Sequence, residues 1–255
     1  MFIIIIIYFI FILGKCKDLQ QLNLFNNKLV GNIPEAICNL SKLEELYLGN
    51  NQLTGEIPKT VSHLHNLKIL SLQMNNLIGS IPATIFNISS LLNISLSYNS
   101  LSGSLPMDMC NSNPKLKELD FSSNHLSGKI PTSLGQCIRL QVISLSFNEF
   151  TGSIPRAIGN LVELQRLSLR NNSLTGTLFS FFFFLFILTF PRAFKDVSKA
   201  VMFFQPTHFN YVAGEIPQSL FNISRLKFLN LAVNNLKGQI PSSLLHCREL
   251  QMLSL

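Results

Sequence analysis

The sequence predicts a repeat solenoid of the α/β class, a horseshoe or superhelix with a parallel β-sheet along its concave face. Three observations predict it. A sixteen-residue motif returns about every 24 residues, one asparagine and one glycine recur at fixed places in the copies, and leucines alternate with other residues ahead of the asparagine. One copy is too small to bury its own leucines, so the copies must stack on one another.

The copies align without gaps. "LQQLNLFNNKLVGNIP" at 19–34 is followed at an offset of 24 by "LEELYLGNNQLTGEIP" at 43–58, and further copies start at residues 67, 91, 116, 140, 164 and 226. The step from the copy at 91 to the copy at 116 is longer by a single residue. The shared pattern L-x-x-L-x-L-x-x-N-x-L is the leucine-rich repeat, and we expect about nine repeats.

The alternation within "LxL" places both leucines on one face of a short strand and the residues between them on the other. The phased asparagine then leaves the strand at a turn inside the stack, where its amide can donate and accept hydrogen bonds. The phased glycine suits a turn with positive φ, and the proline ends pairing along that edge. The expected asparagine ladder consists of Asn27, Asn51, Asn75, Asn99, Asn124, Asn148, Asn172, Asn210 and Asn234.

The regular spacing fails at one internal place. The interval from Gly176 to the next phased glycine, Gly214, exceeds one repeat by more than half a repeat, and the intervening chain includes "LFSFFFFLFILTF" at 178–190. Thirteen residues followed by a proline are too few for a membrane span, which needs about 20. We interpret 179–209 as an irregular Phe-rich insertion, and translated non-coding sequence is the favoured origin over a genuine island between repeats.

The start of the chain is also irregular. Residues 1–12, "MFIIIIIYFIFI", have the length of a signal-peptide core but lack a basic residue in front. A hydrophobic leader and a mistranslated segment both remain open. The expected organisation is therefore the segment at 1–12, repeats at 13–178, the insertion at 179–209, and truncated repeats at 210–255 of a larger ectodomain.

The "GxIP" extension after each repeat carries a family resemblance. "NNQLTGEIP", "IFNIS" at 85–89 and "SLGQCIRLQ" at 133–141 resemble the extracellular repeats of plant leucine-rich repeat receptors, in particular the receptor kinases of immunity. The resemblance implies a ligand-binding ectodomain at the cell surface, reached through the secretory pathway. It implies a peptide or microbial pattern as ligand and a possible co-receptor with leucine-rich repeats. A secreted inhibitor of cell-wall-degrading enzymes is the alternative.

The residues between and after the strand leucines are expected to face solvent on the concave side. Exposed aromatic and arginine side chains commonly dominate protein interfaces. The expected ligand-binding residues are Phe25, Tyr47, Met74, Tyr98, Phe147, Arg166 and Arg170.

No catalytic residues, cofactor or metal site are expected. The five histidines fall at unrelated repeat positions, and the sequence holds no phosphate-binding loop, nucleophile elbow or kinase signature. A kinase domain, if the protein has one, lies outside this chain. The net charge of +7 comes from scattered Lys and Arg, which argues against nucleic acid as a partner.

The cysteines and the glycosylation sequons complete the expectations. Cys16, Cys137 and Cys247 share a hydrophobic repeat position and are predicted to be buried thiols. Cys38 and Cys110 lie three repeats apart, too far to pair, so no disulfide framework is predicted. Among the five sequons, Asn39, Asn87 and Asn222 fall on the convex side and are expected to carry glycans, whereas Asn93 and Asn171 fall on the strand side.

Overall fold

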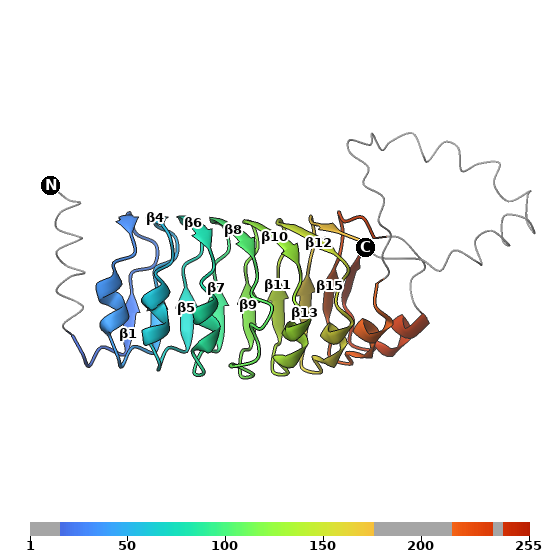
Figure 1. The fold of residues 1–255 in the computed structure, drawn as a ribbon. Helices are drawn as coiled ribbons and strands as arrows, with labels where there is room; N and C mark the ends of the chain where they lie inside the picture. Colours follow the sequence, from blue (N-terminus) through green and yellow to red (C-terminus); the bar gives the residue numbers. More distant parts are fainter. Residues whose placement is uncertain (1–15, 176–215, 237–241) are drawn as a thin grey trace, which may run out of the picture.

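The computed structural model describes residues 16–175, 216–236 and 242–255. Within these ranges the chain winds into a stack of similar rungs that runs from residue 16 to the C-terminus (Figure 1). The predicted leucine-rich repeat solenoid with a parallel sheet is therefore confirmed. The segment at 1–12, the insertion at 179–209 and Asn210 lie outside the described residues.

The first sheet has nine strands, one from each successive rung, and every neighbouring pair is parallel. Its strands are three residues long and follow the order of the sequence. They are β1 (Gln21–Asn23), β3 (Glu45–Tyr47), β5 (Ile69–Ser71), β7 (Asn93–Ser95), β9 (Glu118–Asp120), β11 (Val142–Ser144), β13 (Arg166–Ser168), β15 (Phe228–Asn230) and β16 (Met252–Ser254).

The leucine pattern explains these strands. In β3 the burial alternates, with Leu46 only 2% exposed between the half-buried Glu45 and Tyr47. Register keeps like positions together, since Leu46 pairs with Leu22 on one side and Leu70 on the other. Each buried leucine gains roughly 1.5–3 kcal/mol relative to its exposed state, and it does so only because the next rung covers it.

A second parallel sheet, not predicted from the sequence, follows the asparagine turn of each rung. Its seven strands run along one edge of the stack in Figure 1. They are β2 (Val30–Asn32), β4 (Gln52–Gly55), β6 (Asn76–Ser80), β8 (Ser100–Ser104), β10 (His125–Lys129), β12 (Glu149–Gly152) and β14 (Ser173–Leu174). The phased glycines within the described residues adopt φ between +74° and +86°, as the sequence predicted.

Short 3₁₀-helices close most of the described rungs on the side away from the first sheet, and turns at residues 107–111 take their place in the rung between η3 and η4. They are η1 (Glu35–Asn39), η2 (Lys59–His63), η3 (Ala83–Asn87), η4 (Thr132–Gln136), η5 (Arg156–Asn160), η8 (Gln218–Asn222) and η9 (Ser242–His246). A proline such as Pro58 immediately precedes the helix, with φ near −60°. Neighbouring helices pack so closely that a Cβ on Gly159 would collide with the backbone carbonyl of Ser219 in η8.

The stack is continuous across the irregular part of the sequence. Strand β13 pairs directly with β15, with Arg166 opposite Phe228 and Ser168 opposite Asn230. Helix η8 packs directly against η5, and the Ser219 hydroxyl donates to the Arg156 carbonyl at 2.8 Å. The rung that begins at Leu164 is therefore followed in space by the rung of Leu226.

The cysteine predictions need two corrections. Cys110 and Cys137 form a disulfide, with Cα atoms 5.3 Å apart, although Cys137 was predicted to be a free buried thiol. Cys137 follows Cys110 by 27 residues, which is one 24-residue repeat plus three positions, so the two cysteines lie in adjacent rungs. Adjacent rungs are about 4.8 Å apart, which is within reach of a disulfide. Cys16 is exposed rather than buried, because it lies at the N-terminal edge of the described stack. Cys38 and Cys247 are buried and free.

Candidate functional site

An asparagine ladder supports the face of the nine-stranded sheet. The Asn148 side-chain amide donates to the carbonyls of Leu145 and Ser146 in its own rung and to Phe121 in the preceding rung, at 3.0–3.2 Å. Its Oδ1 accepts from the backbone N–H of Leu126 at 3.0 Å. The same pattern holds at Asn51, Asn75, Asn99, Asn124, Asn172 and Asn234.

The ladder departs from this pattern at its first rung, and from the sequence spacing at Asn234. Among the described residues, the side chain of the exposed Asn27 donates only to the carbonyls of Leu24 and Phe25 in its own rung. The partner of Asn172 toward the C-terminus is Asn234, which accepts from Leu174 N–H at 3.1 Å and donates to Leu169. These are the contacts expected of Asn210 from the sequence spacing.

The residue just before each ladder asparagine adopts a left-handed conformation. Met74, Tyr98 and Phe147 have φ of 54–56°, and their side chains are among the most exposed apolar groups in the described chain. For residues other than glycine this conformation costs about 1–2 kcal/mol. The sequence predicted that these three side chains, which follow the strand leucines, face solvent on the concave side. The structure places them at the turn that ends each strand, in a left-handed conformation that the sequence analysis did not predict.

The other four predicted ligand-binding residues divide between strand and turn. Tyr47 lies in β3 and is half-buried, and Arg166 lies in β13 and is exposed. Phe25 and Arg170 directly follow the last strand leucine of their rungs and are exposed. The seven side chains therefore lie in several rungs from the first to the seventh and do not converge on one pocket.

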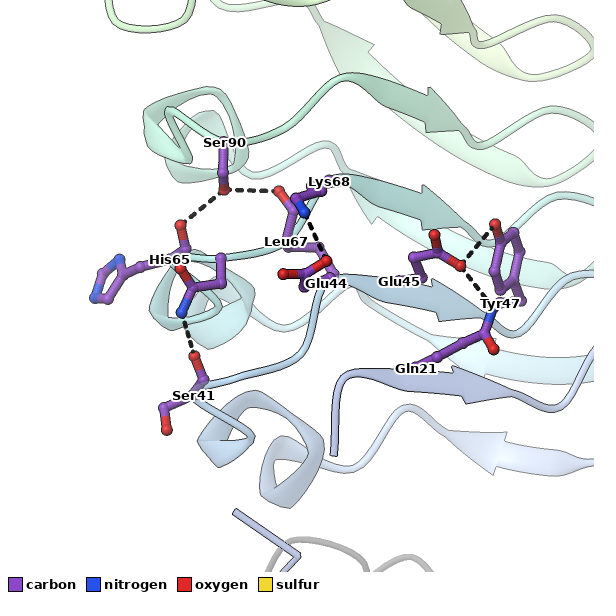
Figure 2. Close-up of polar contacts among 10 residues, drawn as sticks. Gln21, Ser41, Glu44, Glu45, Tyr47, His65, Leu67, Lys68 and Ser90 are labelled. Carbon is purple, nitrogen blue, oxygen red and sulfur yellow. Dashed lines mark hydrogen bonds and ion pairs between the residues drawn. The ribbon is translucent and has the colours of Figure 1, made fainter. Parts of the chain in front are cut away.

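Ion pairs and hydrogen bonds cover the N-terminal part of the sheet face. Figure 2 shows Lys68 paired with Glu44 at 2.6 Å, and Glu45 accepting from Gln21 at 2.6 Å and from the Tyr47 hydroxyl at 3.3 Å. Partial burial and the neighbouring Glu45 raise the pKa of the Tyr47 phenol. Because Glu44 and Glu45 already have partners, their carboxylates are less available to bind a ligand.

The C-terminal part of the sheet face contains a concavity of roughly 680 Å³. It extends across five adjacent strands, from β7 to β15. Its polar and apolar lining includes Asn93, Ser95, Glu118, Asp120, Val142, Ser144, Gln165, Arg166, Ser168 and Phe228. We call this feature the sheet pocket. Of the seven predicted ligand-binding residues, only Arg166 lines it.

Arginines in this region stack on aromatic rings. The Arg166 guanidinium carbon is 5.1 Å from the centre of the Phe228 ring, and that of Arg170 is 5.5 Å from the Phe147 ring. Such contacts are worth about 0.5–1 kcal/mol when exposed, so they orient the guanidinium groups without removing them from solvent. Phe228, which the sequence analysis did not select, is thereby part of the same surface.

The sequons occupy two environments. Asn39, Asn87 and Asn222 are each the last residue of a 3₁₀-helix and are exposed. Asn93 is half-buried in β7 and lines the sheet pocket. Asn171 is exposed in a left-handed turn, with φ of 54°.

The part of the chain that the structure describes contains no cluster of three or more His, Cys, Asp or Glu side chains suited to a metal ion. The same described residues include no helix with the length and hydropathy required to cross a bilayer.

Family models match this geometry. Models described as leucine-rich repeats match residues 18–40, 41–84, 114–174 and 225–247, which together make up more than half of the chain. The chain belongs to the leucine-rich repeat family.

Solved structures similar to this chain include ectodomains of plant receptors. It is 35% identical, with a TM-score of 0.78 over 94% of its length, to the ectodomain of the membrane receptor kinase GASSHO1/SCHENGEN3 from Arabidopsis thaliana in complex with CASPARIAN STRIP INTEGRITY FACTOR 2. It is 32% identical, with a TM-score of 0.76 over 93%, to the plant peptide hormone receptor RGFR1 in complex with RGF2. It is 30% identical, with a TM-score of 0.71 over 95%, to the Arabidopsis receptor kinase HAESA with the peptide hormone IDA and the co-receptor SERK1.

The match is to a part of each receptor. This chain spans 24% of the GASSHO1/SCHENGEN3 chain, 32% of the RGFR1 chain and 38% of the HAESA chain.

Proposed function

We propose that this chain is the ligand-binding part of a plant cell-surface receptor ectodomain, and that it recognises a peptide on the face of its nine-stranded sheet. The observation that carries the proposal is the similarity, at 30–35% identity over 93–95% of the chain, to receptor ectodomains solved with peptide hormones. The chain acts by binding rather than by catalysis, and any kinase domain belongs to sequence outside it. A co-receptor with leucine-rich repeats is the expected second partner, and the HAESA complex includes the co-receptor SERK1.

The surface supports this function in two ways. The face presents exposed aromatic, methionine and arginine side chains at Phe25, Met74, Tyr98, Phe147, Arg166 and Arg170. These are residue types that dominate binding energy when a partner covers them. The sheet and the asparagine ladder beneath them are rigid, so little ordering entropy is lost on the receptor side when a peptide binds.

The disulfide supports an extracellular location. Cystines persist in oxidising compartments and are rare in the cytosol, so the Cys110–Cys137 bond fits a chain that passes through the secretory pathway. The exposed sequons at the ends of η1, η3 and η8 fit the same route.

The test is selection of binders from a phage-displayed library of random twelve-residue peptides. Selected peptides are then measured against the triple variant Tyr47→Ala, Tyr98→Ala and Phe147→Ala. We expect at least a tenfold loss of affinity, because about 1.4 kcal/mol is tenfold and buried aromatic contacts commonly exceed it.

A control variant removes exposed apolar side chains elsewhere. The variant Met107→Ala, Ile138→Ala and Val162→Ala changes three residues outside the strands of the sheet, each more than half exposed. Peptide affinity should stay within twofold of the unmodified chain. Absence of any enriched peptide, or equal losses in the two triple variants, would contradict the proposal.

A further inference from the structure

The sheet pocket carries opposite charges on the two sides of its middle strand, β11. Glu118 and Asp120 lie in β9, and Arg166 lies in β13. Strand β11 separates them, with Val142 opposite both Glu118 and Arg166 in the parallel register. Two strand spacings therefore separate the acidic and basic positions, about 9.6 Å.

These charges have no ionic partner within the described residues. The four ion pairs found there involve none of Glu118, Asp120 and Arg166. Asp120 Oδ1 accepts from the backbone and hydroxyl groups of Ser122, which orients the carboxylate. The contact with Phe228 likewise orients Arg166. This contrasts with the N-terminal part of the face, where Glu44 and Glu45 are both engaged.

The spacing selects among peptide conformations. In a polyproline II helix, residues i and i+3 point the same way and lie about 9.3 Å apart, since three residues make one turn with a rise of about 3.1 Å each. In a β-strand, residues on one face are about 6.7 Å apart at i+2 and about 13.4 Å apart at i+4. Of these three spacings, the polyproline II repeat comes nearest to the separation of the acidic and basic positions on β9 and β13.

We infer that the sheet pocket binds a peptide in polyproline II conformation that carries a Lys or Arg and a carboxylate three residues apart. The basic side chain pairs with Glu118 and Asp120, the carboxylate pairs with Arg166, and the peptide crosses β11 over Val142 and Ser144. This inference rests on the proposed peptide-binding function and adds the charge pattern of the ligand.

The test uses synthetic proline-rich peptides of one composition with Arg and Asp separated by two, three or four positions, each in both sequence orders. Binding to the full chain is measured by fluorescence anisotropy at low salt. We expect the three-position spacing, in at least one order, to bind about threefold to tenfold more tightly than the other spacings.

Charge-neutral variants link the preference to the pocket. Glu118→Gln combined with Asp120→Asn, and separately Arg166→Gln, should each remove the spacing preference. Glu149→Gln and Arg156→Gln, which change exposed charges away from the first sheet, should preserve it. Circular dichroism checks that each variant remains folded.

The outcomes separate this inference from the proposed function. Equal binding of all spacings, or a spacing preference that survives in both pocket variants, would overturn the charge pattern. If library peptides still bind through Tyr47, Tyr98 and Phe147 in that case, the proposed function stands without it. If neither library peptides nor designed peptides bind, both fail.

Discussion

Asn234 donates its side-chain amide to the carbonyl of Leu169 at 2.9 Å, although 65 residues separate them in sequence. In the other rungs the equivalent bond joins residues 27 or 28 apart, as between Asn148 and Phe121. The surplus matches the interval from Gly176 to Gly214. The hydrogen-bond ladder therefore connects the rungs as if the chain between those two glycines were absent.

Deleting residues 177–214 should preserve the fold. The deletion joins Gly176 to Glu215 and creates "LTGEIP", the sequence already present at 53–58. Asn172 and Asn234 would then stand a single repeat apart in sequence. Shortening the connection should stabilise the stack by about 0.8 kcal/mol, since loop-closure cost grows with the logarithm of length. Circular dichroism and thermal melting check this.

A longer deletion serves as its control. Removing residues 177–218 also takes away Ile216 and the buried Pro217 that precedes η8, and it should lower the melting temperature. A melting temperature for the 177–214 deletion several degrees below that of the full chain would mean that the removed residues stabilise the stack.

The asparagine ladder predicts that one kind of substitution, Asn to Asp, lowers the stability of the chain more in the middle of the ladder than at its first rung. Asn148→Asp keeps the oxygen that accepts from Leu126 but removes the donors to three carbonyls. Leaving buried groups unsatisfied costs about 1–3 kcal/mol, and the added charge increases this cost. We expect a clear fall in the urea midpoint, measured by circular dichroism.

Asn27→Asp is the matched comparison. Asn27 is exposed, and within the described residues its side chain bonds only to carbonyls of its own rung, so its replacement should change the midpoint by little. Comparable falls in the urea midpoint at the two positions would show that the hydrogen bonds between rungs contribute little to stability.

Much of this architecture could be predicted from the sequence, because the repeat is itself the structural unit. The phase of Leu46, Leu70 and their equivalents fixed the strands, and the phase of the asparagines indicated the turns. The second sheet was missed although its signal is present. In "QLTG", Leu53 is buried between the exposed Gln52 and Thr54, which is a strand alternation. The glycine and proline nearby favoured a turn interpretation instead.

The surface was harder to predict than the core. Repeat phase shows which side chains leave the core but not the backbone conformation that directs them, so the left-handed turns at Met74, Tyr98 and Phe147 were not predicted. The pocket depends on neighbours in space. Phe228 contacts Arg166 only because β15 follows β13, and the sequence between these strands conceals that adjacency.

The disulfide predicts the number and reactivity of the thiols. Alkylation of the denatured, unreduced chain should modify three of the five cysteines, and reduction should expose all five. In the native chain Cys16 should react first because it is exposed. Burial raises the pKa of the Cys38 and Cys247 thiols, so both should react slowly until the chain unfolds. Mass spectrometry over a time course checks the order.

The same bond should contribute to stability. Replacing Cys110 and Cys137 with serine removes a link across 27 residues, for which a loss of about 2–4 kcal/mol is typical. Cys38→Ser, which leaves the disulfide intact, controls for the introduction of a serine. A chain whose melting temperature is unaffected by dithiothreitol would contradict this prediction.

The sequons should differ in glycan occupancy when the chain is produced in plant secretory cells. Asn39, Asn87 and Asn222 are exposed at helix ends, where a glycan extends into solvent. Asn93 is half-buried in β7 and lines the sheet pocket, so its modification requires the sheet to form afterwards around a bulky group. We expect high occupancy at the first three sites and low occupancy at Asn93, measured by glycopeptide mass spectrometry. Enzymatic removal of the glycans should then leave peptide binding unchanged, whereas a gain in binding after their removal would mean that a glycan normally covers the pocket.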